Sequence, residues 1–398
     1  MIQETRLNND LRNALSGLAS RHMERKLKVL TSQQGSWVEV DNRKVLNLCS
    51  NNYLDLATHP RVKNAAAAAI EKYGCGSGAS RLICGNTPLQ QELERRLASF
   101  KGKDAALLYP SGYAANLGAI SCLAGPGDHI FSDELNHASI IDGSRLSRAA
   151  IEIYPHKNLA YLGERLENTL RASPSTRRLI VTDAVFSMDG DTAPLPGLVE
   201  LAERFECTLM VDEAHATGAL GPGGKGLVSQ FGLEEKVPVI MGTLSKALGS
   251  LGGFIAGSRE LAEYLVNNSR SFIFSTALPP PSVAAALESL TILEESPSLP
   301  EKLLENASYI RDKLTGLGFN TGKSTTQIVP VITGDPLTTS EMAQSLLRGG
   351  VWCASLRPPS VPEGGCRLRL SPMATHTRED LDFAVGVIKK TGRSLGII

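Results

Sequence analysis

The 398-residue sequence has no excess of either charge, because its 41 basic side chains are balanced by 41 acidic ones. Proteins that bind nucleic acids by neutralising phosphates usually carry a basic excess, so this class is disfavoured. The first residues are charged and lack the apolar core of a signal peptide. The longest uncharged stretch, residues 105–127, is interrupted by Pro110 and four glycines, which is atypical of a membrane span. We therefore expect a soluble, cytoplasmic protein that binds neither nucleic acid nor membrane.

Several common site motifs are also missing. The seven cysteines form no CxxC pair and show no metal-ligand spacing, so we expect buried, reduced thiols and no metal. No GxxxxGK[ST] pattern occurs, and no GxGxxG follows the first predicted strand. These absences argue against a P-loop enzyme and against a nucleotide-dependent Rossmann enzyme.

Glycine, by contrast, is abundant and clustered. Of 37 glycines, nine fall in residues 74–127 and eleven in residues 218–257. Clustered glycine indicates backbone that must turn tightly or approach another group closely. We expect these two segments to surround a ligand.

The hydrophobic pattern predicts an α/β protein with a mostly parallel sheet, helices on both faces, and a second, smaller α+β domain. Short apolar runs alternate with helical segments, which is typical of this class. The runs are residues 105–109, 129–132, 150–154, 179–182, 208–211 and 237–241. We divide the chain into an N-terminal helix with short strands (1–45) that packs with the small domain, a large domain (46–285) and the small domain (286–398).

Further elements are expected outside this pattern. Thr87–Gln90 and Thr377–Asp380 match capping boxes and predict helix starts. We predict an amphipathic helix within residues 3–30 and helices over 65–73 and 283–317. Strands are predicted over residues 36–40, 45–47, 328–332, 351–355 and 367–370.

Polar or glycine-rich turns follow four of the apolar runs directly, where an open α/β sheet binds its ligands. Ser111–Asn116 opens a helix whose free N–H groups make an anion site, although a plain turn is the alternative. His137 alone is more often a capping or core residue. Asp212 and His215 follow the fifth run, and a metal site there lacks a third ligand.

Lys246 is the single charged residue between positions 237 and 258. Burial disfavours the ammonium form of a lysine, as Schiff-base chemistry requires. Taken together, the anion site, the histidine, the aspartate and the lysine fit a ligand that has a phosphate, an aromatic ring with a basic nitrogen, and an aldehyde. Pyridoxal 5′-phosphate meets this description.

In these residues the sequence resembles the α-oxoamine synthases, a family of fold-type-I pyridoxal-phosphate enzymes. The resemblance extends over about residues 35–385 and rests on seven motifs. They are residues 50–54, 76–81, 111–116, 136–139, 185–191, 211–215 and 243–247.

The resemblance implies a role for each matched residue near the cofactor. Lys246 would bind the cofactor covalently, and Asp212 would keep its ring nitrogen protonated. His215 would hydrogen-bond the ring hydroxyl, near Ser187, and His137 would stack on the ring. The phosphate would be bound by Gly112, Tyr113 and Thr243.

It also implies a homodimer with the active site at the subunit interface, because Ser275 and Thr276 match the segment that touches the phosphate of the second subunit. Arg369 would bind the carboxylate of the amino acid, as a bidentate guanidinium can. Asn51 is also assigned to the substrate. For Arg367, on the same predicted strand, we favour a solvated strand face.

Residues 356–364 resemble family members that condense L-alanine with a pimeloyl thioester, carried on coenzyme A or on acyl carrier protein, in biotin biosynthesis. This reaction would release carbon dioxide and a free thiol. The alternatives are glycine with acetyl-CoA, or another reaction of the same family, or a binding protein that kept the fold without catalysis.

Three features are left open. Asp55 stands where relatives often have glycine, and Gln90 stands where many have histidine. A basic cluster on the predicted N-terminal helix either meets the acyl donor or forms a solvated face. It comprises Arg21, Arg25, Lys26 and Lys28.

Overall fold

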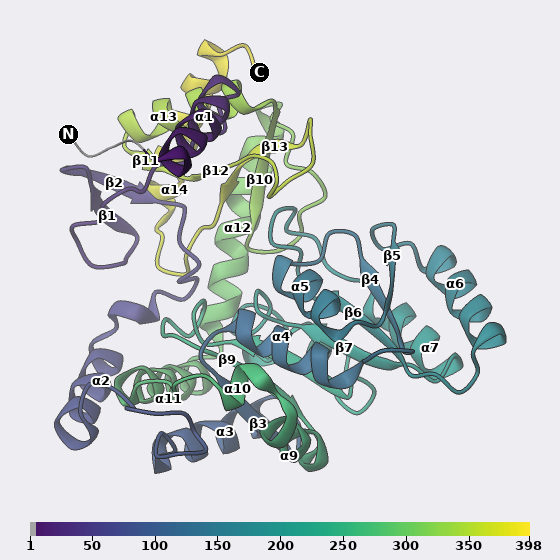
Figure 1. The fold of residues 1–398 in the computed structure, drawn as a ribbon. Helices are drawn as coiled ribbons and strands as arrows, with labels where there is room; N and C mark the ends of the chain where they lie inside the picture. The colour runs from purple at the N-terminus through teal and green to yellow at the C-terminus, as the bar shows by residue number, and fades with distance from the viewer. Residues whose placement is uncertain (1–4) are drawn as a thin grey trace. The chain divides into compact units, whose positions relative to one another are not determined.

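The computed structural model describes residues 5–398, which form two compact units (Figure 1). The larger unit comprises Asn51–Ser187 and Asp191–Leu304. The smaller unit comprises the described residues up to Ser50, the short segment Met188–Gly190, and Glu305–Ile398. The three-part division made from the sequence stays a prediction.

The larger unit is built on a seven-stranded sheet in the order β3-β9-β8-β7-β6-β4-β5. All its strands are parallel except β9, which runs antiparallel to both β3 and β8. The strands are β3 Ala105–Tyr109, β4 His129–Asp133, β5 Ala150–Tyr154, β6 Arg178–Asp183, β7 Thr208–Asp212, β8 Val239–Thr243 and β9 Gly253–Gly257. The predicted mostly parallel α/β sheet is confirmed, whereas β9 was not predicted.

Helices cover this sheet as its connections require. The step from β4 to β5 crosses the sheet in one direction, and the steps from β5 to β6 and β7 cross it in the other. Right-handed crossovers then place α5 on one face and α6 and α7 on the opposite face. The helices of this unit are α2 Pro60–Tyr73, α3 Pro88–Phe100, α4 Gly112–Leu123, α5 Ala138–Ser147, α6 Leu159–Ala172, α7 Leu195–Arg204, α8 Leu227–Gln230, α9 Arg259–Asn268, α10 Arg270–Ile273 and α11 Pro280–Glu295, with short 3-10 turns at Leu56–Thr58 and Pro222–Gly224.

The start of α3 and the region of α11 and the helix after it test two of the predicted helices. The capping box at the start of α3 is confirmed, and Gln90 also donates from Nε2 to the carbonyl of Leu278 at 3.1 Å. The single helix predicted over residues 283–317 is wrong. It is two helices, α11 and α12 (Ser298–Gly316), because Pro297 disfavours helical backbone at the residue before it.

The smaller unit contains two three-stranded sheets, β1-β2-β11 and β10-β13-β12. A core cluster that includes Leu46, Val331, Leu368 and Ile388 is fully buried. The elements are α1 Arg6–Ser20, β1 Trp37–Val40, β2 Arg43–Asn47, β10 Val329–Gly334, α13 Pro336–Arg348, β11 Val351–Trp352, β12 Ala354–Leu356, β13 Cys366–Leu370 and α14 Arg378–Ser394. The second capping box, at the start of α14, is confirmed.

Two expectations from the sequence are wrong in detail. The first helix ends at Ser20, so the basic cluster lies on the segment after it, where Arg25 donates to the carbonyl of Pro358 and Lys28 pairs with Asp41. The seven cysteines form no disulfide, but Cys75 and Cys84 are exposed and not buried. Within residues 5–398, no helix has the length and hydrophobicity needed to cross a membrane.

Candidate active site

The carboxyl ends of the parallel strands bring most of the predicted residues of the larger unit to one edge of the sheet. Helix α4 begins there, with Ser111 as its N-cap accepting the N–H of Ala114 at 3.1 Å. The N–H groups of Gly112 and Tyr113 precede that bond and have no acceptor within the helix. A Cβ built on Gly112 would lie 2.9 Å from Met241 Cε and 3.6 Å from Thr243 Oγ1, so the helix start and the end of β8 are in contact.

Asp212 ends β7 and is 3% exposed. Its Oδ1 accepts the N–H of Ala214 at 2.8 Å, and its Oδ2 accepts the side-chain amide of Asn116 at 2.7 Å. These two donors fix the orientation of the carboxylate. Asp212 is therefore a buried carboxyl group held in a fixed orientation at the sheet edge.

A chain of hydrogen bonds leads from Asp212 to His137. Asn116 Nδ2 also donates to Ser139 Oγ at 2.8 Å, and Ser139 Oγ lies 2.7 Å from His137 Nδ1. The N–H of Ser139 can only donate, and it points to His137 Nδ1 at 3.2 Å. In the neutral ring, Nδ1 is thus the acceptor and Nε2 carries the proton.

The His137 ring is accessible to solvent, and it lies edge-on to Tyr113, with centroids 6.5 Å apart. Desolvation by the surrounding protein lowers the pKa of His137, the nearby Asp212 carboxylate opposes this, and the Lys246 ammonium adds to it. His137 is therefore neutral at physiological pH, as a residue that stacks on an aromatic ring can be.

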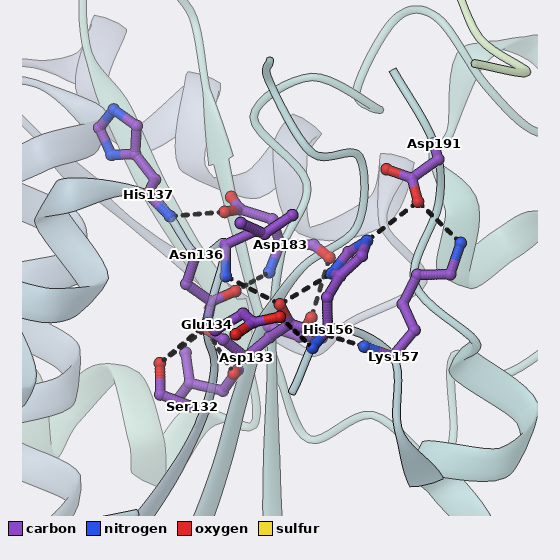
Figure 2. Close-up of polar contacts among 12 residues, drawn as sticks. Ser132, Asp133, Glu134, Asn136, His137, His156, Lys157, Asp183 and Asp191 are labelled. Atoms are coloured by element: carbon purple, nitrogen blue, oxygen red, sulfur yellow. Dashed lines mark hydrogen bonds and ion pairs between the residues drawn. The ribbon is translucent and has the colours of Figure 1, made fainter. Parts of the chain in front are cut away.

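Asp183 lies beside Asp212, since the two end neighbouring parallel strands in register. Its Oδ2 accepts the backbone N–H of His137 at 2.7 Å, and its own N–H donates to Asn136 Oδ1 at 2.9 Å (Figure 2). Burial and, next to it, the charge of Asp212 raise the pKa of Asp183 well above its usual range. Asp183 is thus a buried acid whose ionised form is disfavoured beside Asp212.

The turn after β8 carries Lys246, which is half-buried. The turn is closed by Leu244 N–H to the Gly252 carbonyl at 2.9 Å and by Gly249 N–H to the Lys246 carbonyl at 2.9 Å. The Thr243 hydroxyl donates to the Gly252 carbonyl at 2.8 Å, so in this structure it holds the turn. Its predicted role at a phosphate stays a prediction.

His215 is buried on the turn after β7, with Nδ1 2.7 Å from the Tyr53 hydroxyl. That hydroxyl donates to Asn51 Oδ1 at 3.1 Å, so His215 is the donor to Tyr53. The turn itself is anchored by the buried pair Lys101–Glu213, at 2.7 Å. Two predicted residues, Asn51 and His215, are thereby linked through Tyr53.

The remaining predicted residues of this unit lie on two loops. Ser187 is half-buried after β6. Ser275 and Thr276 follow α10, and Thr276 pairs with Ser80 in a β-bridge. The assignments of these residues to the cofactor stay predictions.

Arg369 and Arg367 lie on β13 of the smaller unit and are both buried. The expectation that Arg367 lies on a solvated face is wrong. Its guanidinium donates to Asp189 at 2.5 Å, to the Met188 carbonyl at 3.2 Å and to the Gly365 carbonyl at 2.8 Å. The assignment of Arg369 to a substrate carboxylate stays a prediction.

The two departures from the family pattern have local explanations. Asp55 has φ +59°, a left-handed conformation that favours glycine but that aspartate tolerates. Its carboxylate accepts the Asn52 side-chain amide at 3.2 Å. Gln90 caps α3 and holds the Leu278 carbonyl, as described above.

Sequence reasoning missed four residues that organise this site: Tyr53, Asn116, Ser139 and Asp183. Tyr53, Asn116 and Ser139 lie inside the family motifs, but nothing in the neighbouring sequence shows which partner their side chains contact. Asp183 was recognisable only as an acid at the end of a buried strand, the same position that singled out Asp212.

The seven-stranded sheet, with a lysine, an aspartate and a histidine at its carboxyl edge, is the fold-type-I architecture of pyridoxal-phosphate-dependent transferases. The chain belongs to the aminotransferase class I and II family, whose model matches residues 43–388.

Among individual proteins, the chain is 48% identical over 386 residues to the 8-amino-7-oxononanoate synthase of Citrifermentans bemidjiense, covering 96% of this chain and 98% of that protein. It is 49% identical to the 8-amino-7-oxononanoate synthase of Geobacter sulfurreducens, with the same coverage. Among solved structures, it matches a serine palmitoyltransferase from S. paucimobilis with a TM-score of 0.93 at 32% identity, covering 99% of this chain and 100% of that one.

Proposed function

We propose that the protein is a pyridoxal-phosphate-dependent acyltransferase that condenses L-alanine with a pimeloyl thioester. The products are 8-amino-7-oxononanoate, carbon dioxide and a free thiol, as in biotin biosynthesis. The observation that carries the chemistry is that Asp212, linked to His137 through Asn116 and Ser139, lies at the same sheet edge as Lys246, whose charge acts on His137. The choice of substrates rests on the near 50% identity to synthases of that name. Backbone similarity does not distinguish substrates, because it is also high to a serine palmitoyltransferase.

The residues present fit pyridoxal phosphate by their chemistry. Lys246 offers an amine to an aldehyde, Asp212 offers a fixed carboxylate to a basic ring nitrogen, and the start of α4 offers free N–H groups to a phosphate. Glycine at position 112 keeps that helix start open, since a side chain there would meet Met241. The bound cofactor supplies an electron sink for the pairs left by the α-proton and by carbon dioxide.

The chain's own residues then have separate tasks. The Lys246 amine would hold the cofactor, and as a free amine it would take the α-proton of alanine. Asp212, whose carboxylate is oriented by Asn116 and by the Ala214 N–H, would pair with the ring nitrogen and keep it protonated. His137, neutral and protonated at Nε2, would stack on the ring. Arg369 and Asn51 bind the amino-acid substrate, and the acyl donor is a thioester of coenzyme A or of acyl carrier protein.

The proposal includes a homodimer that acts in the cytoplasm and completes each active site with Ser275 and Thr276 of the second subunit. Three large apolar side chains near that segment are exposed: Ile83 at 78%, Phe274 at 71% and Leu82 at 51%. The two loops that carry them are joined by the Ala277 N–H to the Ala79 carbonyl at 3.0 Å. A second copy of the chain would cover these side chains.

Product analysis tests the substrates. The purified protein is incubated with L-alanine or glycine, in each case with pimeloyl-CoA, pimeloyl-acyl carrier protein or acetyl-CoA. We expect carbon dioxide and thiol release with L-alanine and a pimeloyl donor, and a product of the mass of 8-amino-7-oxononanoate. Turnover with glycine and acetyl-CoA alone would overturn the substrate assignment and favour the alternative within the family.

Replacement of the lysine tests the chemistry. Lys246→Ala is expected to abolish the absorbance of covalently bound cofactor and to lower kcat by at least about 10³, as loss of both the anchor and the base requires. Lys225→Ala is the matched control, because that side chain is exposed on a loop of the same unit. If Lys246→Ala keeps the absorbance and the turnover, the assignment is wrong.

A further inference from the structure

His156 follows β5 and forms a bridge between two carboxylates (Figure 2). Its Nδ1 lies 2.9 Å from Asp133 Oδ1, and its Nε2 lies 3.0 Å from Asp191 Oδ2. The edge of its ring packs against Phe186, with centroids 4.3 Å apart. An ionised carboxylate can only accept hydrogen bonds, so both ring nitrogens must donate and the ring is an imidazolium.

The charges around His156 support this protonation state. Lys157 Nζ also donates to Asp191 Oδ2, at 2.8 Å, and Glu134 accepts the backbone N–H of His156 at 2.8 Å. Burial by itself would lower the pKa of His156, but its hydrogen bonds to Asp133 and Asp191 raise it to about 9. The carboxylate of Asp191 has a lowered pKa despite its burial, because His156 and Lys157 donate to it.

Asp133 holds the turn that leads to His137. Its Oδ1 accepts the N–H of Leu135 at 2.9 Å, and its Oδ2 accepts the N–H of Lys157 at 2.9 Å. The N–H of Asn136 donates to the Asp133 carbonyl at 3.1 Å. The position of His137 therefore depends on the orientation of Asp133.

Asp191 holds a second segment, the hairpin on which Ser187 lies. The Asp191 carbonyl accepts the N–H of Phe186 at 3.0 Å. One residue closer to β6, Val185 pairs with Thr192 in a β-bridge. Asp191, the residue that His156 binds, therefore lies where the second half of the hairpin comes back to the sheet edge.

We propose that His156 is a positioning residue, which as an imidazolium ties the turn of His137 (residues 133–137) to the hairpin of Ser187 (residues 184–192). The inference deepens the proposed function, because both segments face the cofactor in that proposal. Loss of the proton from His156 leaves one ring nitrogen facing a carboxylate without a hydrogen to donate, and it loosens both segments.

Hydrogen exchange of the protein without cofactor tests the bridge. In His156→Gln at pH 7.5, we expect the amides of residues 184–192 and 133–137 to exchange roughly tenfold faster or more, the effect of losing a charge-assisted hydrogen bond. Arg165→Gln is the matched control, because it breaks a 3.0 Å ion pair with Glu152 nearby and leaves His156 intact. Exchange in His156→Gln that equals the wild type overturns the proposal.

The pH dependence separates this role from simple packing. The folded pKa lies above the value of about 6.5 for an unperturbed histidine, so the bridge is complete below pH 6.5 and is lost as the pH rises through about 9. After correction for the intrinsic rate, wild-type exchange in residues 184–192 is expected to rise with a midpoint near pH 9. It should show no such step in His156→Gln. A His156 titration midpoint below 7, measured by NMR, overturns the proposal.

Asp191→Asn serves where His156→Gln does not fold. The substitution keeps the size of the side chain and removes one of the two carboxylate charges that face His156, so the pH midpoint of the His156 titration is expected to fall. Hydrogen exchange is expected to rise in residues 184–192 more than in residues 133–137. An unchanged midpoint overturns the proposal. These readouts use no cofactor or substrate, so failure of the enzyme assay and failure of the bridge are distinguishable.

Discussion

Asn116 links the chemistry of Asp212 to the position of His137. Its side-chain amide reaches Asp212 and, through Ser139, His137, and its own carbonyl oxygen Oδ1 has no partner among the described residues. Without Asn116, the buried Asp212 carboxylate would lose one of the donors that orient it. We therefore expect the strength of cofactor binding to depend on a residue that does not itself touch the cofactor.

Asn116→Ala is expected to weaken cofactor binding about 10–100-fold, which corresponds to about 1.5–3 kcal/mol for a hydrogen bond to a charged group. The dissociation constant is measured by absorbance titration of the apoprotein. Ser121→Ala on the same helix is the control, because its hydroxyl bonds the Leu117 and Gly118 carbonyls of that helix. Equal affinities in the two variants would contradict this role.

The sequence predicted several site residues but not the residues that their side chains contact. An acid or a lysine after a buried strand is recognisable, because the strand pattern is local. Asn116 and Asp212 are 96 positions apart, and Arg367 and Asp189 are 178 apart. Such pairs depend on how strands and loops meet in three dimensions, so Arg367 was wrongly expected on a solvated face.

At the scale of elements, the turn after β8 depends on Gly249. Its φ is +58°, and a Cβ built on it would lie 2.4 Å from the backbone nitrogen of Ala57. Gly223 has a similar φ of +59° but no atom within 4 Å of such a Cβ. The two glycines thus share the backbone strain and differ only in the close approach.

Gly249→Ala is expected to destabilise the protein by about 2–5 kcal/mol, from about 1–2 for the left-handed conformation and about 1–3 for overpacking. Gly223→Ala should destabilise the protein only by the contribution of the left-handed conformation, about 1–2 kcal/mol. The measurement is the unfolding temperature of each variant, at roughly 1–2 °C per kcal/mol for a chain of 398 residues. If Gly249→Ala lowers the unfolding temperature no more than Gly223→Ala does, the close contact with Ala57 does not add to the destabilisation and the prediction is wrong.

Element prediction succeeded where the determinants were local. Both capping boxes were recognisable because the residues that satisfy the first N–H groups lie within four positions. Strand β9 was missed, since Gly253–Gly257 has only three apolar residues between glycines and one of its two partners, β3, lies far along the chain. The break between α11 and α12 was missed although Pro297 marks it, because the apolar pattern continues on both sides.

At the scale of the whole molecule, the exposed side chains Ile83 and Phe274 predict where a second copy would bind. Replacing either with aspartate would place a charge in an apolar interface, which costs far more than it does at a solvated surface. We expect Phe274→Asp and Ile83→Asp to sediment as monomers and the wild type as a dimer. Leu146→Asp, at an exposed apolar position on α5, should stay dimeric, and monomeric wild type would contradict the prediction.

A mixing experiment tests whether the second copy also completes the site. Lys246→Ala lacks the reactive amine but keeps Ser275 and Thr276, whereas a variant with both of those residues changed to alanine keeps Lys246. In a symmetric dimer, random mixing makes about half of the dimers mixed, and each mixed dimer has one complete site, so activity should recover to about a quarter of wild type. Recovery requires refolding the two together, because exchange of subunits must occur. If the mixture is no more active than the sum of the separate variants, Ser275 and Thr276 act within their own subunit or not at the phosphate.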